Sequence, residues 1–210
     1  MCIRDRLLSI CPENYPIDVT VKENHWIENQ PLTGEAQVIL YTDGSKEGDR
    51  TGAGWLATHG DLVLAEDCMP LGEKNTVFQA EVIAISEALT WIKANLDEDT
   101  LVSVRSDSQA AIQAILGRIC TSKLVKECKL RLALAKESLQ VHLEWIKGHA
   151  DFTGNEAADM LAKRGNQHSR EMLGPTPAVS IPLVEIKNRI KDKYMSKWQV
   201  RWTNTETCTR

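Results

Sequence analysis

The sequence VILYTDGS, residues 38–45, decides the fold of this chain of 210 residues. Its first four residues are apolar or aromatic, which predicts a strand that is buried on both faces and therefore central in a sheet. The strand is expected to end at Asp43, because Gly44 and Ser45 are typical turn residues. A carboxylate at the end of a central strand lies where α/β sheets form their ligand crevice. Taken alone, Asp43 is as consistent with the start of a turn, since Asp-Gly is a common turn pair.

Composition and cysteine spacing limit the class of protein. The chain is 42% hydrophobic and 26% charged, as in ordinary globular proteins. It has no apolar run near the ~20 residues that cross a bilayer, and residues 1–6 lack the apolar core of a signal peptide. The six cysteines form no Cys-x-x-Cys pair and no zinc-binding spacing. We therefore expect an intracellular protein, cytoplasmic or nuclear rather than secreted, with reduced cysteines and no membrane partner.

Residues 37–166 have the pattern of one domain. Apolar runs and alternating residues predict five strands, at 38–43, 53–58, 62–68, 101–106 and 141–146. The first three are expected to form an antiparallel meander with a turn at 59–61, and the last two to be added in parallel. The predicted class is α/β, a mixed α+β arrangement of three layers with helices on both faces of the sheet.

Helix positions are predicted from capping residues that precede apolar stripes. Helices are expected after Thr76, Ser108 and Ser122, the first of them ending near residue 95. A fourth is expected to begin with the Thr-x-x-Glu capping box at 153–156 and to close near Gly165.

Three segments lie outside this domain, one before it and two after it. Residues 1–36 are predicted to be an extended lead, and residues 1–6 are set aside because such a start can come from cloning or library sequence. A linker is predicted at 167–181, which contains Gly-Pro-Thr-Pro. Residues 182–210 are a predicted helical tail in which every fourth residue of one series is apolar or aromatic: Ile186, Ile190, Tyr194, Trp198 and Trp202.

The tail is basic although the chain is acidic. Residues 182–202 hold six lysines and arginines against two acids, a net charge of +4, whereas the whole chain carries −4. The rest of the chain therefore sums to −8, which argues against a strongly basic nucleic-acid-binding domain. The tail helix is most simply an amphipathic docking surface. A basic face with aromatic residues is also typical of single-strand binding.

Four acids stand out by position. Asp43 and Asp107 follow central strands, and Glu81 and Asp159 lie early in helices with alanine neighbours that permit close packing on the sheet. Each helix acid alone is most simply a solvated side chain. Together, four carboxylates repel one another unless cations neutralise them. Oxygen ligands favour Mg²⁺ or Mn²⁺, and two such ions about 3.5–4 Å apart are the arrangement that cleaves phosphodiesters.

The sequence around each acid resembles one of the four blocks of the ribonuclease H family. The strings are YTDGS at 41–45, FQAEVIAI at 78–85, RSDSQAAI at 105–112 and WIKGHADFTGNEAADMLAK at 145–163. They occur in the family's order and span residues 37–166. The resemblance implies a ribonuclease H-like fold in which the acids bind two Mg²⁺ ions, with Mn²⁺ as a substitute. One ion is expected on Asp43 and Asp159, and the other on Asp43, Glu81 and Asp107.

The same resemblance implies the reaction and its setting. The expected activity is internal hydrolysis of the RNA strand of RNA–DNA hybrids, leaving a 3′-hydroxyl and a 5′-phosphate, with His149 assisting proton transfer or product release. The loops and the tail are most similar to the ribonuclease H region that ends a non-LTR retrotransposon polyprotein, which implies an upstream reverse transcriptase domain. Two alternatives stay open: a catalytically weak or inactive module that binds hybrid, and a DNA transposase or integrase of the same fold class.

The substrate contacts expected from these blocks depart from the family in one place. Val77 and Phe78 stand where cellular enzymes carry an amide pair that reads RNA 2′-hydroxyls.

Arg105 is a further residue that could contact phosphate or simply be an exposed strand-end charge. The spacing from Asp107 to His149 leaves room for two helices, so the bacterial basic handle is expected to be absent and the grip on substrate weaker. The residues expected to bind substrate are Gly44, Ser45, Lys74, Asn75, Thr76, Gln79, Ser108, Gln109 and Asn155.

Overall fold

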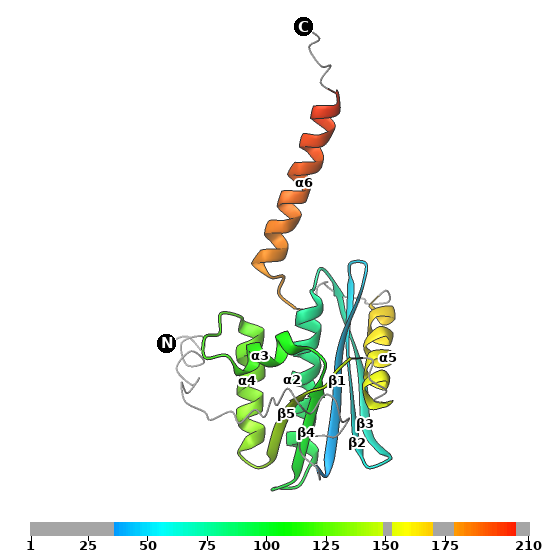
Figure 1. Cartoon of the computed structure of the whole chain (residues 1–210), viewed down its shortest axis with the longest axis vertical. Helices are drawn as coiled ribbons and strands as arrows, with labels where there is room; N and C mark the ends of the chain where they lie inside the picture. Colours follow the sequence, from blue (N-terminus) through cyan, green and yellow to red (C-terminus); the bar gives the residue numbers. More distant parts are fainter. Residues whose placement is uncertain (1–35, 149–152, 170–178, 205–210) are drawn as a thin grey trace.

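The computed structural model describes residues 36–148, 153–169 and 179–204. Its centre is a five-stranded sheet in the order β3-β2-β1-β4-β5 (Figure 1). The pairs β1–β2 and β2–β3 are antiparallel, and the pairs β1–β4 and β4–β5 are parallel. The predicted mixed sheet is thus confirmed. The strands are β1 (Val38–Glu47), β2 (Arg50–His59), β3 (Leu62–Glu73), β4 (Leu101–Ser106) and β5 (Gln140–Trp145).

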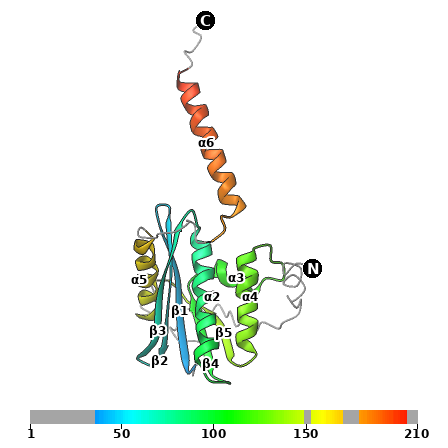
Figure 2. The ribbon, with the colours of Figure 1, turned by 180° about the vertical axis from the view of Figure 1, so that it is seen from behind.

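Helices cover both faces of the sheet (Figures 1 and 2). One face carries α2 and α4, with α3 beside α4, and the other face carries α5, which packs across β1, β2 and β3. The predicted three-layer arrangement is therefore confirmed. The helices are α2 (Val77–Asn95), α3 (Gln109–Leu116), α4 (Lys123–Lys136), α5 (Thr153–His168) and α6 (Leu183–Asn204).

The capping residues predicted for three helices are confirmed. The hydroxyl of Thr76 accepts a hydrogen bond from Gln79 N, and the side chain of Gln79 accepts from Thr76 N, a complete capping box. Ser108 and Ser122 likewise accept from backbone N–H groups of the first turns of α3 and α4. Such caps satisfy N–H groups that have no partner within the helix.

The main core lies between the sheet and α2. Leu40, Val102 and Val104 of the strands pack with Ile85 and Leu89 of α2, and all five side chains are at most 1% exposed. The stripe of α2 is thus buried as predicted, and its burial fixes the face of α2 that meets β1.

Glycines bring α5 close to the sheet, and two predictions there are wrong. The second strand was expected to start at residue 53, but β2 already begins at Arg50 and includes Gly52. A Cβ at Gly54 would lie 2.4 Å from Ala162 N, so only glycine permits this approach. Gly165 does not close α5, which continues to His168, because it too lies against the sheet: its Cβ would be 2.6 Å from Met69 O.

The expected end of β1 at Asp43 is also wrong. The strand runs on to Glu47, and Asp43 is paired with Gly54 of β2. The parallel pairing with β4, however, stops at Thr42 and Ser106. The sheet therefore opens between β1 and β4 directly at Asp43, which preserves the reason for expecting a ligand crevice there.

The helix α6 extends away from the sheet (Figures 1 and 2). Its start is held by an ion pair of 3.4 Å between Arg189 and Asp49 in the β1–β2 turn, and by a hydrogen bond from Gln79 to the carbonyl of Ser180. Among the helices of the described residues, none is both long and apolar enough to cross a membrane.

Candidate active site

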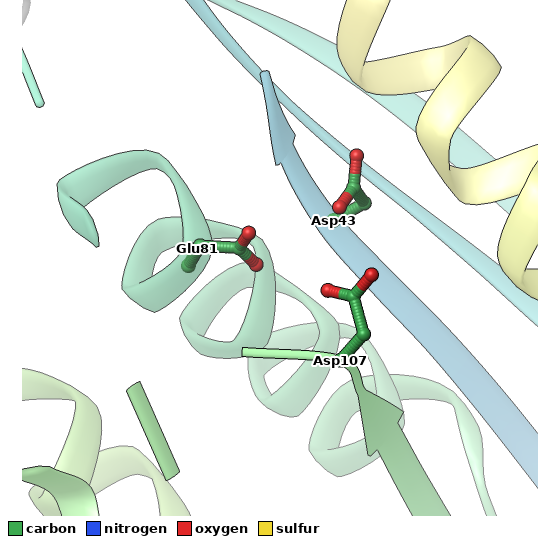
Figure 3. A group of neighbouring side chains, drawn as sticks. All are labelled: Asp43, Glu81 and Asp107. Atoms are coloured by element: carbon green, nitrogen blue, oxygen red, sulfur yellow. The ribbon is translucent and has the colours of Figure 1, made fainter. Parts of the chain in front are cut away.

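Three of the four predicted acids converge at the opening between β1 and β4. Asp43 comes from β1, Glu81 from α2 and Asp107 from the residue after β4, and their carboxyl groups point toward one another (Figure 3). One carboxylate oxygen of each lies within 4.8 Å of the others. This spacing allows all three to contact one cation.

Close backbone packing holds these acids in place. A Cβ at Gly44 would lie 2.5 Å from Glu81 N, so the glycine after Asp43 lets the first turns of α2 rest on β1. The backbone carbonyl of Asp107 accepts a hydrogen bond of 2.7 Å from Trp145 Nε1. Gly148 lies beside the same residue: a Cβ at position 148 would be only 2.7 Å from Asp107 Oδ2. Each acid is therefore fixed by a neighbour from another segment.

Burial and mutual repulsion disfavour ionisation of the Asp43 and Glu81 carboxyl groups. Burial, followed by the charges of Asp107 and Asp159, raises the pKa of Asp43 from 3.8 to about 7. Burial, followed by the charges of Asp43 and Asp107, raises the pKa of Glu81 from 4.5 to about 9. Glu81 Oε2 is buried and has no hydrogen-bond partner among the described residues. An all-oxygen donor set with an unsatisfied buried oxygen fits a hard divalent cation, although the nature of the ion is not fixed by it.

The fourth acid, Asp159, lies at the rim of the same pocket, outside the group of three. Its carboxylate is partly exposed and accepts a bond of 2.6 Å from Lys163 Nζ, which raises the pKa of that lysine. Lys163 is not among the residues predicted for the site, although its i,i+4 spacing from Asp159 is a signal for such a pair. The pocket, of about 210 Å³, is lined by Asp43, Gly44, Ser45, Lys46, Asp107, Asn155, Glu156 and Asp159.

Three further predicted residues also lie in this pocket. Gly44 and Ser45 form part of its wall, and Ser45 Oγ accepts a hydrogen bond of 3.2 Å from Asn166 Nδ2. Asn155 is the third residue of α5 rather than its capping residue, and it is 7% exposed. Its Oδ1 is buried without a hydrogen-bond partner in the described part of the chain, so it can accept a hydrogen bond from a ligand or water.

The predicted contacts before Glu81 are occupied within the protein. Thr76 and Gln79 cap α2, and Gln79 Nε2 also donates to Ser180 O at 2.9 Å. Asn75 is fully buried and donates to Leu71 O at 2.6 Å. Lys74, with a φ of 70°, forms the turn that enters α2. Contact with substrate through the side chains of Asn75, Thr76 or Gln79 requires that they exchange their present partners.

The remaining predicted residues differ in accessibility. Gln109 is exposed at the start of α3, and Ser108 is its cap. His149 lies outside the described residues. Arg105 is neither exposed nor available to phosphate: it is 3% exposed, and its Nε donates to Glu144 Oε2 at 3.1 Å. The idea of an exposed strand-end charge at this position is therefore wrong, because the side chain points into the protein beside β5.

Known proteins with similar sequences come from one family. The model of the family "RNase H" matches residues 35–167. The ribonuclease H of Jannaschia sp. (strain CCS1) is 34% identical over 145 residues, which are 61% of this chain and 90% of that protein. The ribonuclease H of Bordetella pertussis is 31% identical over 161 residues, 69% of this chain and 99% of that protein.

Solved structures with a similar fold also include ribonucleases H. LC11-RNase H1 in complex with an RNA/DNA hybrid aligns with a TM-score of 0.54 and 25% identity, over 63% of this chain and 99% of that one. The prototype foamy virus protease-reverse transcriptase aligns with a TM-score of 0.53 and 22% identity, over 66% of this chain and 22% of that one, a likeness of fold alone. Because the family model covers more than half of the sequence, the chain belongs to the ribonuclease H family.

Proposed function

We propose that this chain hydrolyses the RNA strand of RNA–DNA hybrids at internal positions, leaving a 3′-hydroxyl and a 5′-phosphate. The single observation that carries the proposal is the convergence of Asp43, Glu81 and Asp107 at the opening of the sheet in a domain of this family. An isolated buried carboxyl cluster would be a stability cost without use. A related protein, LC11-RNase H1, was solved with such a hybrid bound.

The four acids are the proposed ligands of two Mg²⁺ or Mn²⁺ ions. When bound, such ions activate a water and neutralise charge at the scissile phosphate. Asp43, Glu81 and Asp107 would hold one ion, and Asp43 and Asp159 would hold the other, for which Asp159 must exchange its bond to Lys163. The burial of Glu81 keeps bulk water from its carboxylate. Asn155 Oδ1 orients a water in the pocket, and His149 carries a proton.

Substrate recognition is proposed to combine the pocket wall with shape. Gly44, Ser45 and Asn155 line the pocket, and Ser108 and Gln109 stand next to Asp107. We assign them contacts to the sugar and phosphate of the RNA strand, whose 2′-hydroxyls and wide minor groove distinguish it from DNA. Asn75, Thr76 and Gln79 contribute only if their internal hydrogen bonds open, whereas Lys74 could contribute from the turn that enters α2.

The setting we propose is an intracellular retroelement polyprotein with a reverse transcriptase domain upstream. The support is the basic aromatic tail of the sequence and the presence of this fold within a protease-reverse transcriptase chain. In that setting, cleavage would remove template RNA after it has been copied.

A hybrid-binding module with little activity is a second candidate, favoured by one observation. Lys163 neutralises Asp159, so the fourth acid is already paired. If this pair persists on substrate, only three acids remain for cations.

Cleavage of an RNA strand labelled at one end tests the proposal. We expect internal cuts in an RNA–DNA hybrid with Mg²⁺, no cuts with a chelator, and no cuts in duplex DNA of the same sequence. A folded protein that binds the hybrid but leaves it intact with Mg²⁺ and with Mn²⁺ would favour the binding module. Cleavage of duplex DNA instead would favour a transposase-like activity.

A further inference from the structure

The helix α6 concentrates exposed apolar and aromatic side chains. It holds eight of the fifteen large apolar side chains that are exposed in the described residues, with Tyr194 at 67%, Trp198 at 53% and Trp202 at 66%. The indoles of Trp198 and Trp202 are stacked, with centroids 5.4 Å apart. The other described elements leave most of α6 uncovered (Figures 1 and 2). A patch of this kind indicates an interaction surface.

Most charges on α6 are separated by sign around the helix axis. Successive residues are rotated by about 100°, so positions three and four apart share a face. Both acids lie on one such face with most of the neutral polar residues, and Arg189 lies beside them, paired with Glu185 at 2.8 Å. The five other lysines and arginines lie on the remaining circumference together with the aromatic residues. A helix that docks on a protein core has its charges opposite the apolar stripe, which is not the case here. The acidic and polar face consists of Glu185, Asn188, Asp192, Ser196, Gln199 and Thr203.

One line along α6 combines cations with aromatic rings. Lys187, Lys191, Tyr194 and Trp198 follow one another at spacings of four, three and four, and Trp202 continues the line by stacking on Trp198. All five side chains are exposed. We call these five residues the aromatic-basic stripe. Cations nearest the domain and rings farther out are the two components of single-strand binding sites.

The stripe starts at the end of the domain where the acids lie. Ser180 is hydrogen-bonded to Gln79, two residues before Glu81, and Arg189 is paired with Asp49 in the turn that follows β1. From there α6, with 22 residues, extends for about 33 Å. A nucleic-acid strand that leaves the pocket toward this end of the sheet would run toward the stripe.

We infer that the aromatic-basic stripe binds single-stranded nucleic acid, such as the unpaired continuation of a substrate strand. Lys187 and Lys191 contact phosphates, and Tyr194, Trp198 and Trp202 stack on bases. This binding does not depend on the proposed cleavage. A second copy of the chain fits less well, because side chains at every fourth position drift by about 40° per step, whereas a coiled-coil seam repeats every 3.5 residues.

Fluorescence anisotropy with a labelled oligothymidylate and the full chain, in chelator, tests this inference. We expect the double variant Trp198→Ala/Trp202→Ala to weaken binding at least about tenfold. The double variant Lys187→Gln/Lys191→Gln should reduce the slope of log affinity against log salt by about 1.4. The matched control on the opposite face, Ser196→Ala/Thr203→Ala, should bind as the wild type does.

Equal affinity of the tryptophan variant and the wild type would overturn the inference. So would a tryptophan variant that loses self-association in sedimentation while its oligothymidylate binding is unchanged, because the surface would then be a protein interface. Circular dichroism of every variant confirms folding. Since the assay contains neither hybrid nor metal, a failure of hybrid cleavage leaves its result valid.

Discussion

Glu81 is a buried acid at the centre of the proposed site. It is 5% exposed, one of its oxygens is without a partner in the described structure, and its pKa is raised to about 9. Asp43, beside it, has a pKa raised to about 7. In both cases burial is the largest cause. The metal-free protein therefore keeps protons on these groups at pH values where an exposed carboxyl group has lost them.

Without divalent cations, the protein should lose stability as the pH rises. The unfolded chain releases these protons near pH 3.8 and 4.5, whereas the folded chain holds them until about 7 and about 9. The folded state binds more protons in between, so its stability is complete below the unfolded values and decreases as pH passes through the folded ones. The melting temperature in chelator, measured from about pH 5 to about pH 9, should fall.

Variants and metal separate this effect from general pH sensitivity. Glu81→Gln should flatten the pH dependence, Mg²⁺ should restore the melting temperature at high pH, and the exposed Glu98→Gln should change neither. A melting temperature that rises with pH, or the same slope in Glu81→Gln, would contradict the account.

Sequence patterns predicted the presence and type of each strand and helix more accurately than its first and last residues. The alternating strand β4 and the capped helices α2, α3 and α4 agree with prediction because their signals are local. Prediction failed for the ends of β1 and α5 and for the start of β2, because the glycines there permit close packing instead of forming turns. A glycine in a turn and a glycine under a helix look alike in a single sequence, and only the tertiary contact distinguishes them.

The contact between β2 and α5 should tolerate no added methyl group at Gly54. A Cβ there would meet backbone atoms of Leu161 and Ala162 within 2.7 Å. We expect Gly54→Ala to destabilise the fold by about 1–3 kcal/mol, as overpacking does, and to reduce hybrid cleavage because α5 carries Asp159. Chemical denaturation measures the first effect. In the control Gly117→Ala the new methyl group would approach no atom closer than 3.2 Å, and a loss as large as that of Gly54→Ala would argue against this explanation.

For the molecule as a whole, the sequence predicted which acids meet, and three of them do so within 4.8 Å. It did not predict that Asn75 and Gln79 use their side chains inside the fold, because these hydrogen bonds depend on which groups folding buries. The pairing of Asp159 with Lys163 was likewise not foreseen. The assignment of roles in binding metal and substrate therefore remains a prediction for experiment.

The protein should hold a blunt RNA–DNA hybrid less tightly than a bacterial enzyme with a basic handle. Residues 107–145, all of which the structure describes, contain only α3 and α4 before β5. Without a third, basic helix, fewer phosphates are neutralised and affinity falls. Dissociation constants at equal salt, in chelator, measure this. Equal affinity for the same blunt hybrid would show that another surface replaces the handle.

The most direct test of the central claim compares hybrid cleavage by wild-type protein and Asp107→Asn in Mg²⁺. The substitution keeps the size of a side chain that meets Asp43 and Glu81 and removes its charge. We expect internal cleavage of the RNA strand to fall by at least about two orders of magnitude. Asp61→Asn, in the exposed β2–β3 turn, should cleave as the wild type does. Undiminished cleavage by a folded Asp107→Asn protein would show that the acid cluster is not the active site.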